Sequence, residues 1–354
     1  MPARLPTLHP AALALALGLA ALAPAARALD FVIADVGATP MSAQQLAAVQ
    51  AATRYWQGRL SDDITVYLNV SFADLGANVL ASTNPDKTVL GYGLLRERLA
   101  ADALSATDAS AVGHLQGGAA LSFIATQPDL SRRLDDDGSV NNAQLYLTTA
   151  NARALGLDTI NQPGSPDASI RFASGFAGSF AYTRDGLTAG QIDFTTVAEH
   201  EIGHALGFIS GVDDIDFCLD HASQCGSSGG FEDSPWYYAL DLFRYSAPGT
   251  LDLAVGGSPY FSVDGGATAI QPFATGVAHG DGSQASHFDG SVLTLMRPAI
   301  GRGQSYDATA SDLAALDAIG WNLAVTAVPE PQGWAPLLGG LGLILGWARR
   351  RGRR

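Results

Sequence analysis

The spacing of apolar side chains predicts a chain in which helices and strands are mixed. From Ser42, a typical N-cap residue, to Arg59, apolar residues recur every three or four positions, which predicts a helix. The same spacing over 311–319 predicts a last helix that ends at Gly320. Residues 64–72 are mostly β-forming and partly alternate with polar residues, so they predict a strand.

Weaker patterns complete this outline. Helical spacing is present over 89–104, and shorter elements are expected over 145–154 and 169–172. Residues 260–270 place an Asp-Gly pair between two β-forming runs, which predicts a hairpin. No repeat of fixed period is present, and helices and strands do not alternate as they do in βαβ units. The sequence therefore predicts an α+β fold rather than a doubly wound sheet.

The N-terminal end has the composition of a targeting segment. Arg4 precedes an apolar run over 11–23, and Ala26-Arg27-Ala28 has the small-x-small pattern of a cleavage site. The run is too short for a membrane-spanning helix. We therefore expect residues 1–28 to be a signal peptide that is removed on export.

The C-terminal end, 326–354, predicts a second address. Pro329-Glu330-Pro331 is followed by an apolar stretch over 334–347 and by five arginines within the last six residues. This order resembles the PEP-CTERM sorting tail of Gram-negative bacteria. The resemblance implies transient anchoring in the inner membrane through 334–348, processing by an exosortase-type enzyme, and delivery to the cell surface or extracellular matrix. A plain tail anchor is the alternative, although the stretch is short for a stable span.

Composition and charge restrict the partners of the remaining chain. The 354 residues are 47% hydrophobic and 15% charged, which excludes a disordered chain. Residues 29–328 carry 13 basic and 33 acidic side chains, a net charge of −20. An acidic body of this size repels phosphate backbones, so nucleic acid is excluded as a partner.

The chain has two cysteines, Cys218 and Cys225. In an exported protein, this pair predicts one disulfide that closes a short loop. A Cys/His zinc site that includes His221 is the competing interpretation, but it needs a reducing compartment and further ligands.

The most informative motif lies near the start of a predicted helix in the second half of the chain. His200-Glu201-Ile-Gly-His204 places two imidazoles one turn apart on one helix face, where they can bind one metal ion. Glu201 is rotated away from that face by one residue, so it can reach water bound to the ion as a general base. The capping-box spacing of Thr196 and Glu199 predicts a helix start just ahead of His200, while Asp193 could cap the helix or orient a ligand.

The motif continues to Gly207 and thereby resembles the metzincin metallopeptidases, whose motif is His-Glu-x-x-His-x-x-Gly-x-x-His. Ser210 occupies the place of the third histidine. Downstream, His287 precedes Leu295-Met296-Arg-Pro298, which resembles the metzincin Met-turn. Leishmanolysin-like members carry an insertion between the glycine and the third histidine, and the same order is present here.

This resemblance implies a metzincin-like metallopeptidase domain over 29–325, of which 29–192 is the N-terminal part and 193–325 carries the zinc-binding and Met-turn residues. It implies that His200, His204 and His287 bind one catalytic Zn²⁺, that Glu201 is the base and that Met296 forms the turn. His279 and Asp213 stay open as alternatives to His287, because catalytic zinc accepts either ligand type.

The expected function is that of an exported zinc endopeptidase acting on protein or peptide substrates. The alternative is a non-enzymatic acidic surface or matrix protein with a structural metal. Asp-Gly pairs such as Asp137-Gly138 permit Ca²⁺ sites, although turn chemistry explains them more simply. A general base between two ligand histidines favours the enzyme, because a structural metal site has no need of one.

Overall fold

The computed structural model describes residues 28–157, 165–225 and 231–324. The chain divides into two units, Met1–Leu323 and Ala324–Arg354, and every element below belongs to the first. The predicted sorting tail 326–354, including the apolar stretch 334–348, lies outside the described residues, and so does the predicted signal peptide apart from residue 28. Within the described ranges, none of the helices has the length and apolar character needed to cross a bilayer.

The described residues form a mixed α and β structure without a closed barrel. The helices are α1 Ala43–Gln57, α2 Tyr92–Asp102, α3 Ala106–Gly113, α4 Val140–Ala143, α5 Thr149–Ala154, α6 Phe194–Ala205, α7 Val212–Asp220 and α8 Ala310–Ala318. The strands are β1 Asp30–Asp35, β2 Thr65–Ala73, β3 Ala81–Pro85, β4 Lys87–Gly91, β5 Phe123–Thr126, β6 Arg132–Asp135, β7 Gln144–Thr148, β8 Ala168–Ala173, β9 Phe180–Ala181, β10 Ile192–Asp193, β11 Arg244–Ala247, β12 Thr250–Leu251, β13 Tyr260–Phe261 and β14 Gln271–Pro272.

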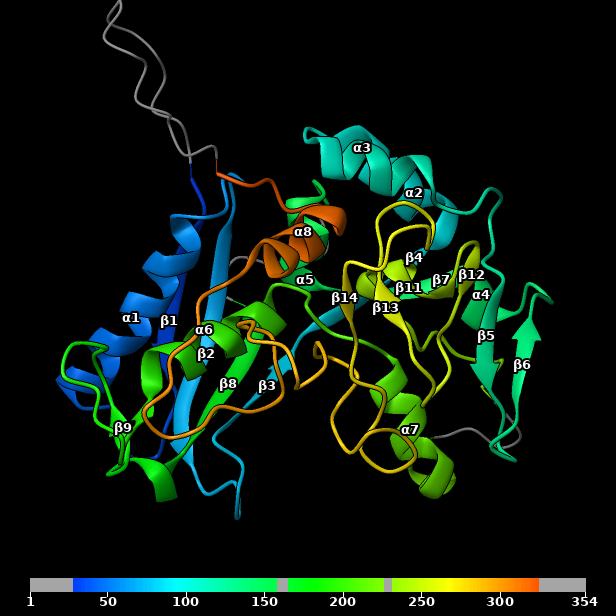
Figure 1. Cartoon of the computed structure of the whole chain (residues 1–354). Coiled ribbons are helices and arrows are strands. Elements are labelled where there is room, and N and C mark those ends of the chain that lie inside the picture. The colour runs from blue at the N-terminus through cyan, green and yellow to red at the C-terminus, as the bar shows by residue number, and fades with distance from the viewer. Residues whose placement is uncertain (1–27, 158–164, 226–230, 325–354) are drawn as a thin grey trace, which may run out of the picture. The chain divides into compact units, whose positions relative to one another are not determined.

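One four-stranded sheet supports the region of the histidine motif. Its order is β1-β2-β8-β3, with β1, β2 and β8 parallel and β3 antiparallel at the edge. Helices α1 and α6 pack against each other over this sheet, and α6 lies beside β3 (Figure 1). The ring of Phe194, the first residue of α6, lies 4.6 Å from the ring of Phe172 on β8. Burying these rings fixes α6 on the sheet.

The hydrophobic core joins the N-terminal and C-terminal parts of the first unit. Trp56 on α1 and Trp321 after α8 are both fully buried. The Trp56 indole donates to the carbonyl of Glu199, and the Trp321 indole donates to that of Leu206. The middle of α6 and the residue that follows its last turn are therefore tied to distant segments by buried hydrogen bonds.

Most of the predicted elements are present. Helix α1 begins after Ser42, whose side chain accepts from the Gln45 backbone in a capping box, and β2 covers the predicted strand. Helix α8 ends before Gly320, which has a φ of +99° that favours glycine. The prediction of one helix over 89–104 is wrong for its first residues. Val89 and its neighbours pair with β7 in strand β4, and α2 begins only after Gly91.

The predicted hairpin is shorter than expected. Its strands β13 and β14 contain two residues each, and β14 begins after Ile270 rather than at residue 267. The reason is that the Asp264 carboxylate accepts from both the backbone and the hydroxyl of Thr268. These bonds hold residues 264–268 as a loop and withdraw them from the strand ladder.

Candidate metal centre and active-site cleft

Helix α6 carries the first two histidines, and its start is set by Asp193. The Asp193 side chain accepts from the Thr195 backbone N–H at 3.0 Å, and the Thr196 hydroxyl donates to it at 2.6 Å. The predicted capping box of Thr196 and Glu199 is therefore wrong, because both residues lie inside the helix. Of the two roles considered for Asp193, the structure shows the cap.

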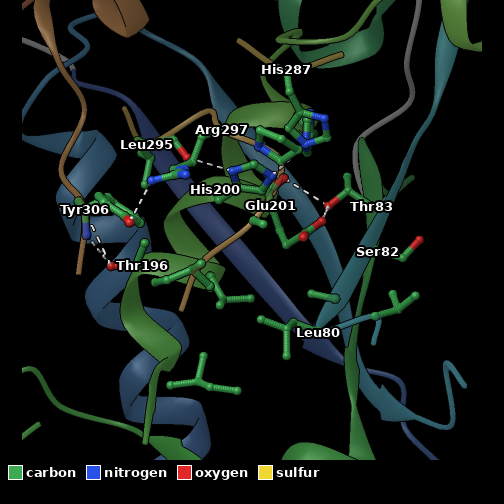
Figure 2. Close-up of a pocket in the computed structure, with 18 of the residues that line it drawn as sticks. Leu80, Ser82, Thr83, Thr196, His200, Glu201, His287, Leu295, Arg297 and Tyr306 are labelled. Atoms are coloured by element: carbon green, nitrogen blue, oxygen red, sulfur yellow. Dashed lines mark hydrogen bonds between the residues drawn. The ribbon is translucent and has the colours of Figure 1, made fainter. Parts of the chain in front are cut away.

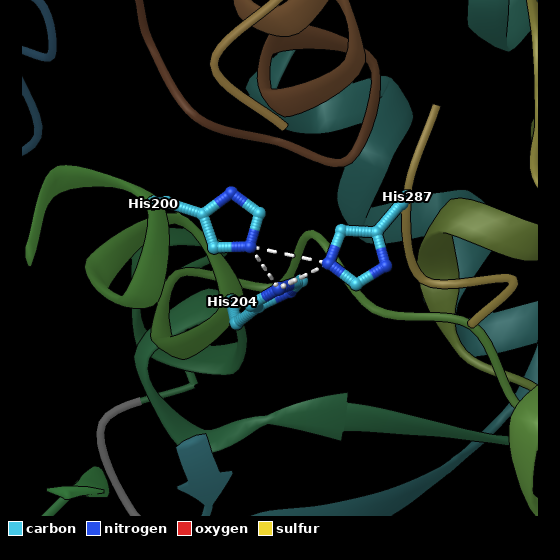
Figure 3. A group of neighbouring side chains, drawn as sticks. All are labelled: His200, His204 and His287. Carbon is cyan, nitrogen blue, oxygen red and sulfur yellow. Dashed lines mark hydrogen bonds between the residues drawn. The ribbon is translucent and has the colours of Figure 1, made fainter. Parts of the chain in front are cut away.

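Three histidine side chains converge on one point (Figure 3). The Nε2 atoms of His200 and His204 are 3.0 Å apart, and the Nε2 atom of His287 lies 3.1 Å from His200 and 3.2 Å from His204. Each Nδ1 lies against a backbone carbonyl: Leu295 for His200 at 2.8 Å, Phe208 for His204 at 2.6 Å and Gln284 for His287 at 3.1 Å.

These contacts test whether the group fits a metal ion. A carbonyl only accepts, so each Nδ1 must carry a proton, and a neutral ring then leaves an unprotonated Nε2. Three lone pairs that face one another at 3.0–3.2 Å repel unless an electrophile lies among them. Four-coordinate zinc with bonds of about 2.0–2.1 Å needs nitrogen separations of about 3.3 Å. The arrangement fits a metal ion by both criteria, and the carbonyls supply the orienting partners typical of ligand histidines.

Burial keeps the three rings neutral. Loss of hydration lowers the pKa of His200 and lowers that of His204 further, with the neighbouring histidines adding to the effect. The same burial, followed by the charge of His200, lowers the pKa of His287 to about 3. Neutral imidazole is the form that binds metal.

Glu201 lies beside the histidine group, held by a residue that sequence reasoning missed. The Thr83 hydroxyl on β3 lies 2.6 Å from Oε2 of Glu201 and 3.0 Å from its backbone carbonyl (Figure 2). Burial raises the pKa of Glu201 to about 7, and the Thr83 hydrogen bond opposes this rise. A carboxyl group tuned near neutrality is suited to accepting and returning a proton. No sequence signal links Thr83 to Glu201, because 118 residues separate them.

Met296 packs against helix α6. Its side chain is fully buried and fills the space next to Gly203, between the two histidines of α6. The Asp312 carboxylate accepts from the backbone N–H groups of Leu295 and Met296, which holds this turn against the start of α8. The Leu295 carbonyl in turn contacts His200.

The alternatives to His287 lie elsewhere. The Asp213 carboxylate accepts from the backbone N–H groups of Ala285 at 2.6 Å and Ser286 at 2.9 Å, and from the Ser286 hydroxyl. Asp213 thus holds the loop that carries His287 instead of joining the histidine group. His279 faces Asp220, with its Nε2 atom 3.2 Å from the carboxylate.

A cleft of about 830 Å³ opens over the histidine group. Its walls come from β3 and the three residues before it on one side and from the segment after Met296 on the other, and Phe176, Val197 and Ile209 add apolar surface. Figure 2 shows Leu80 and Ser82 on one side of His200 and Arg297 and Tyr306 on the other. The volume is in the range of clefts that bind small molecules or short peptides.

The remaining candidates take other roles. Cys218 and Cys225 form the predicted disulfide, and the ring of His221, within the loop that it closes, stacks on the ring of Phe217. Asp137 lies near two other carboxylates, those of Asp135 and Glu232, within 4.8 Å of one another. Asp135 also accepts from two asparagine amides.

Comparisons of the chain with protein-family models, with curated proteins and with solved structures found no match. The assignment of the site rests on its residues and geometry.

Proposed function

We propose that this chain is an exported zinc-dependent endopeptidase. One observation carries the proposal: three histidine Nε2 atoms form a triangle with sides of 3.0–3.2 Å next to the buried carboxylate of Glu201, within an open cleft. A neutral three-imidazole set with space beside it is typical of catalytic zinc, whereas structural zinc sites have four protein ligands.

Each residue of the site has a separate role in the proposed reaction. Zinc held by His200, His204 and His287 would supply Lewis acidity to a water molecule and to the substrate carbonyl. Glu201 accepts a proton from the attacking water and delivers it to the departing amine. Thr83 fixes one carboxylate oxygen of Glu201, so that the other is left for this transfer. Edge strand β3 and the segment 297–302 form the walls between which the substrate lies.

Export and surface retention belong to the same proposal. The predicted signal peptide and PEP-CTERM-like tail support it, and so does the disulfide, because disulfides persist in oxidising compartments. An exosortase-type enzyme is the expected processing partner at the tail. Mass determination of the mature protein tests this part, since uncleaved ends would contradict it.

The deciding experiment combines zinc content with casein hydrolysis for the purified protein and three variants. Glu201→Gln should keep zinc and the folded state but lose about 10²–10⁴-fold in turnover. His287→Ala should lose the metal, because two imidazoles cannot hold it tightly. Glu97→Gln, an exposed change of the same chemistry on α2, should leave both unchanged.

Each other outcome has a defined meaning. Zinc without hydrolysis in the unmodified protein would favour a surface protein with a structural metal. Near-normal hydrolysis by Glu201→Gln would remove the proposed base.

A further inference from the structure

Positive side chains outnumber negative ones in the lining of the cleft, and the proposed reaction has no role for this excess. Apart from the histidines, the charged side chains in its walls are Glu201, Arg297 and Arg302. Glu201 is the only carboxylate among these lining residues. A cationic wall in a protein with a formal net charge of −14 is a local reversal of sign.

In the described ranges, the Arg297 guanidinium has no carboxylate partner. Its Nη1 donates to the Tyr306 hydroxyl at 2.8 Å and its Nη2 donates to the Gly290 carbonyl at 2.5 Å, both of which are neutral acceptors. Its Nε has no acceptor, and no carboxylate of the described residues lies within 4 Å of the guanidinium. A guanidinium has five N–H donors and stays charged at every relevant pH.

The guanidinium of Arg297 is also held in place. It lies over the ring of Tyr306, with 4.9 Å between the guanidinium carbon and the ring centre. Arg302 is fixed by a bond from its Nη1 to the Gly190 carbonyl, and in the described part of the chain it too has no ion pair. Arg184 shows the contrast, since it contacts the carboxylates of Asp193, Glu199 and Asp307.

We propose that Arg297 and Arg302 form a subsite that selects substrates with a carboxylate close to the cleaved bond. This inference rests on the proposed peptidase function and names its substrate class. Arg297 follows Leu295, whose carbonyl contacts His200, by two residues. The Arg297 guanidinium therefore lies within the length of about three extended peptide residues from the histidine group. A carboxylate matches the fork of a guanidinium and would take up the donors that neutral groups leave free.

The test compares internally quenched peptides of one sequence in which a single position, scanned over three residues on either side of the cleaved bond, is Glu, Gln or Lys. At one position, Glu should raise kcat/KM about 10-fold or more over Gln, because a hydrogen-bonded ion pair replaces a neutral contact. Arg297→Gln and Arg302→Gln should each lower that Glu/Gln ratio, and 0.5 M NaCl should lower it in the unmodified protein. Arg133→Gln, an exposed change on β6 outside the cleft, should leave the ratio unchanged.

The source of the carboxylate is resolved by a second pair of peptides, one with a free C-terminus and one with a C-terminal amide. If the free C-terminus raises kcat/KM and the side-chain carboxylate does not, the subsite binds terminal carboxylates. Arg297 and Arg302 then still bind a carboxylate, but the protein is an exopeptidase. A ratio near one at every position, with no gain from the free C-terminus, would overturn the inference.

Binding distinguishes failure of this inference from failure of the proposed function. Fluorescence anisotropy of the Glu and Gln peptides on Glu201→Gln protein measures selection without turnover. Tighter binding of the Glu peptide that is lost on Arg302→Gln supports the subsite even if no peptide is cleaved. Equal binding of both peptides overturns it even if both are cleaved. Arg302 is exposed, so this variant serves if Arg297→Gln does not fold.

Discussion

A substitution at Gly203 tests how tightly Met296 packs against helix α6, which carries His200 and His204. A Cβ atom at position 203 would lie 2.6 Å from Sδ and 3.0 Å from Cε of Met296, and 3.5 Å from the ring of Trp56. Favourable contacts between non-bonded heavy atoms begin near 3.5 Å, so an alanine here overlaps the methionine sulfur by almost an ångström. Met296 is fully buried, and it cannot withdraw without displacing its neighbours.

Two effects of opposite sign set the magnitude. Overpacking a core typically costs about 1–3 kcal/mol. Replacing glycine by alanine within a helix gains about 0.5–1 kcal/mol. Gly203→Ala should therefore lower the free energy of unfolding by about 1–2 kcal/mol on balance. Met296→Ala alone costs about 2–5 kcal/mol through the cavity it leaves, but it removes the overlap.

In the Met296→Ala background, Gly203→Ala should thus become stabilising by about 0.5–1 kcal/mol. The assay is urea unfolding of the four metal-free proteins, which gives the coupling between the two sites. Gly93→Ala on α2 is the control, since a Cβ there meets only Ala119 at an ordinary 3.9 Å and should have one effect in both backgrounds. Additive effects of Gly203→Ala and Met296→Ala would refute the packing argument.

Three further predictions concern the supports of the site. Asp213→Ala should weaken zinc affinity about 10- to 100-fold, because it releases the backbone N–H groups of the loop that carries His287; Asp214→Ala on the same helix should not, and equal affinities in a competition titration would contradict the role. Replacing Cys218 and Cys225 by serine should cost about 2 kcal/mol in urea unfolding, as expected for a loop of this length, with zinc content unchanged; loss of zinc would mean that the loop supports the centre. The pKa of His287 is lowered to about 3 in the folded state, so the unfolded chain takes up the proton first below its ordinary pKa of about 6.5. The stability advantage of the metal-free protein over His287→Gln should therefore shrink as the pH falls from 6.5 to 5, by up to about 1.4 kcal/mol per pH unit; a constant difference would contradict the burial argument.

The sequence was informative where the chemistry is local. The spacing of His200 and His204 places them on one helix face because a helix turn is 3.6 residues, and the structure brings their Nε2 atoms to 3.0 Å. The helix start was predicted incorrectly because two residues with capping-box spacing, Thr196 and Glu199, lie one turn inside a helix that Asp193 caps. Local patterns of this kind compete, and the packing of Phe194 on the sheet decides between them.

Residues that act across long separations could not be predicted. Thr83 reaches Glu201 only because β3 is the edge strand beside α6, and no periodicity in the sequence specifies that neighbour. The third histidine left three alternatives for the same reason, since spacing along a loop does not fix where a side chain lies. Residues 89–91 of strand β4 were predicted as helix because the pairing of β4 with β7 is a tertiary contact that overrides local propensity.

Some of the acidic residues have a structural role that the net charge of the chain does not reveal. The segment 273–309, which carries His287 and Met296, contains no helix or strand, so its backbone N–H groups need other acceptors. Asp213 and Asp312 supply them, one for the His287 loop and one for the Met296 turn, and both carboxylates are largely removed from water. Asp193 does the same at the start of α6. Each segment that contributes to the histidine group is thus held by a carboxylate, and only that of Asp193 was given a supporting role from the sequence. A fold that positions loops in this way needs buried acceptors, and part of the excess of acidic residues over basic ones serves that need rather than a charged surface.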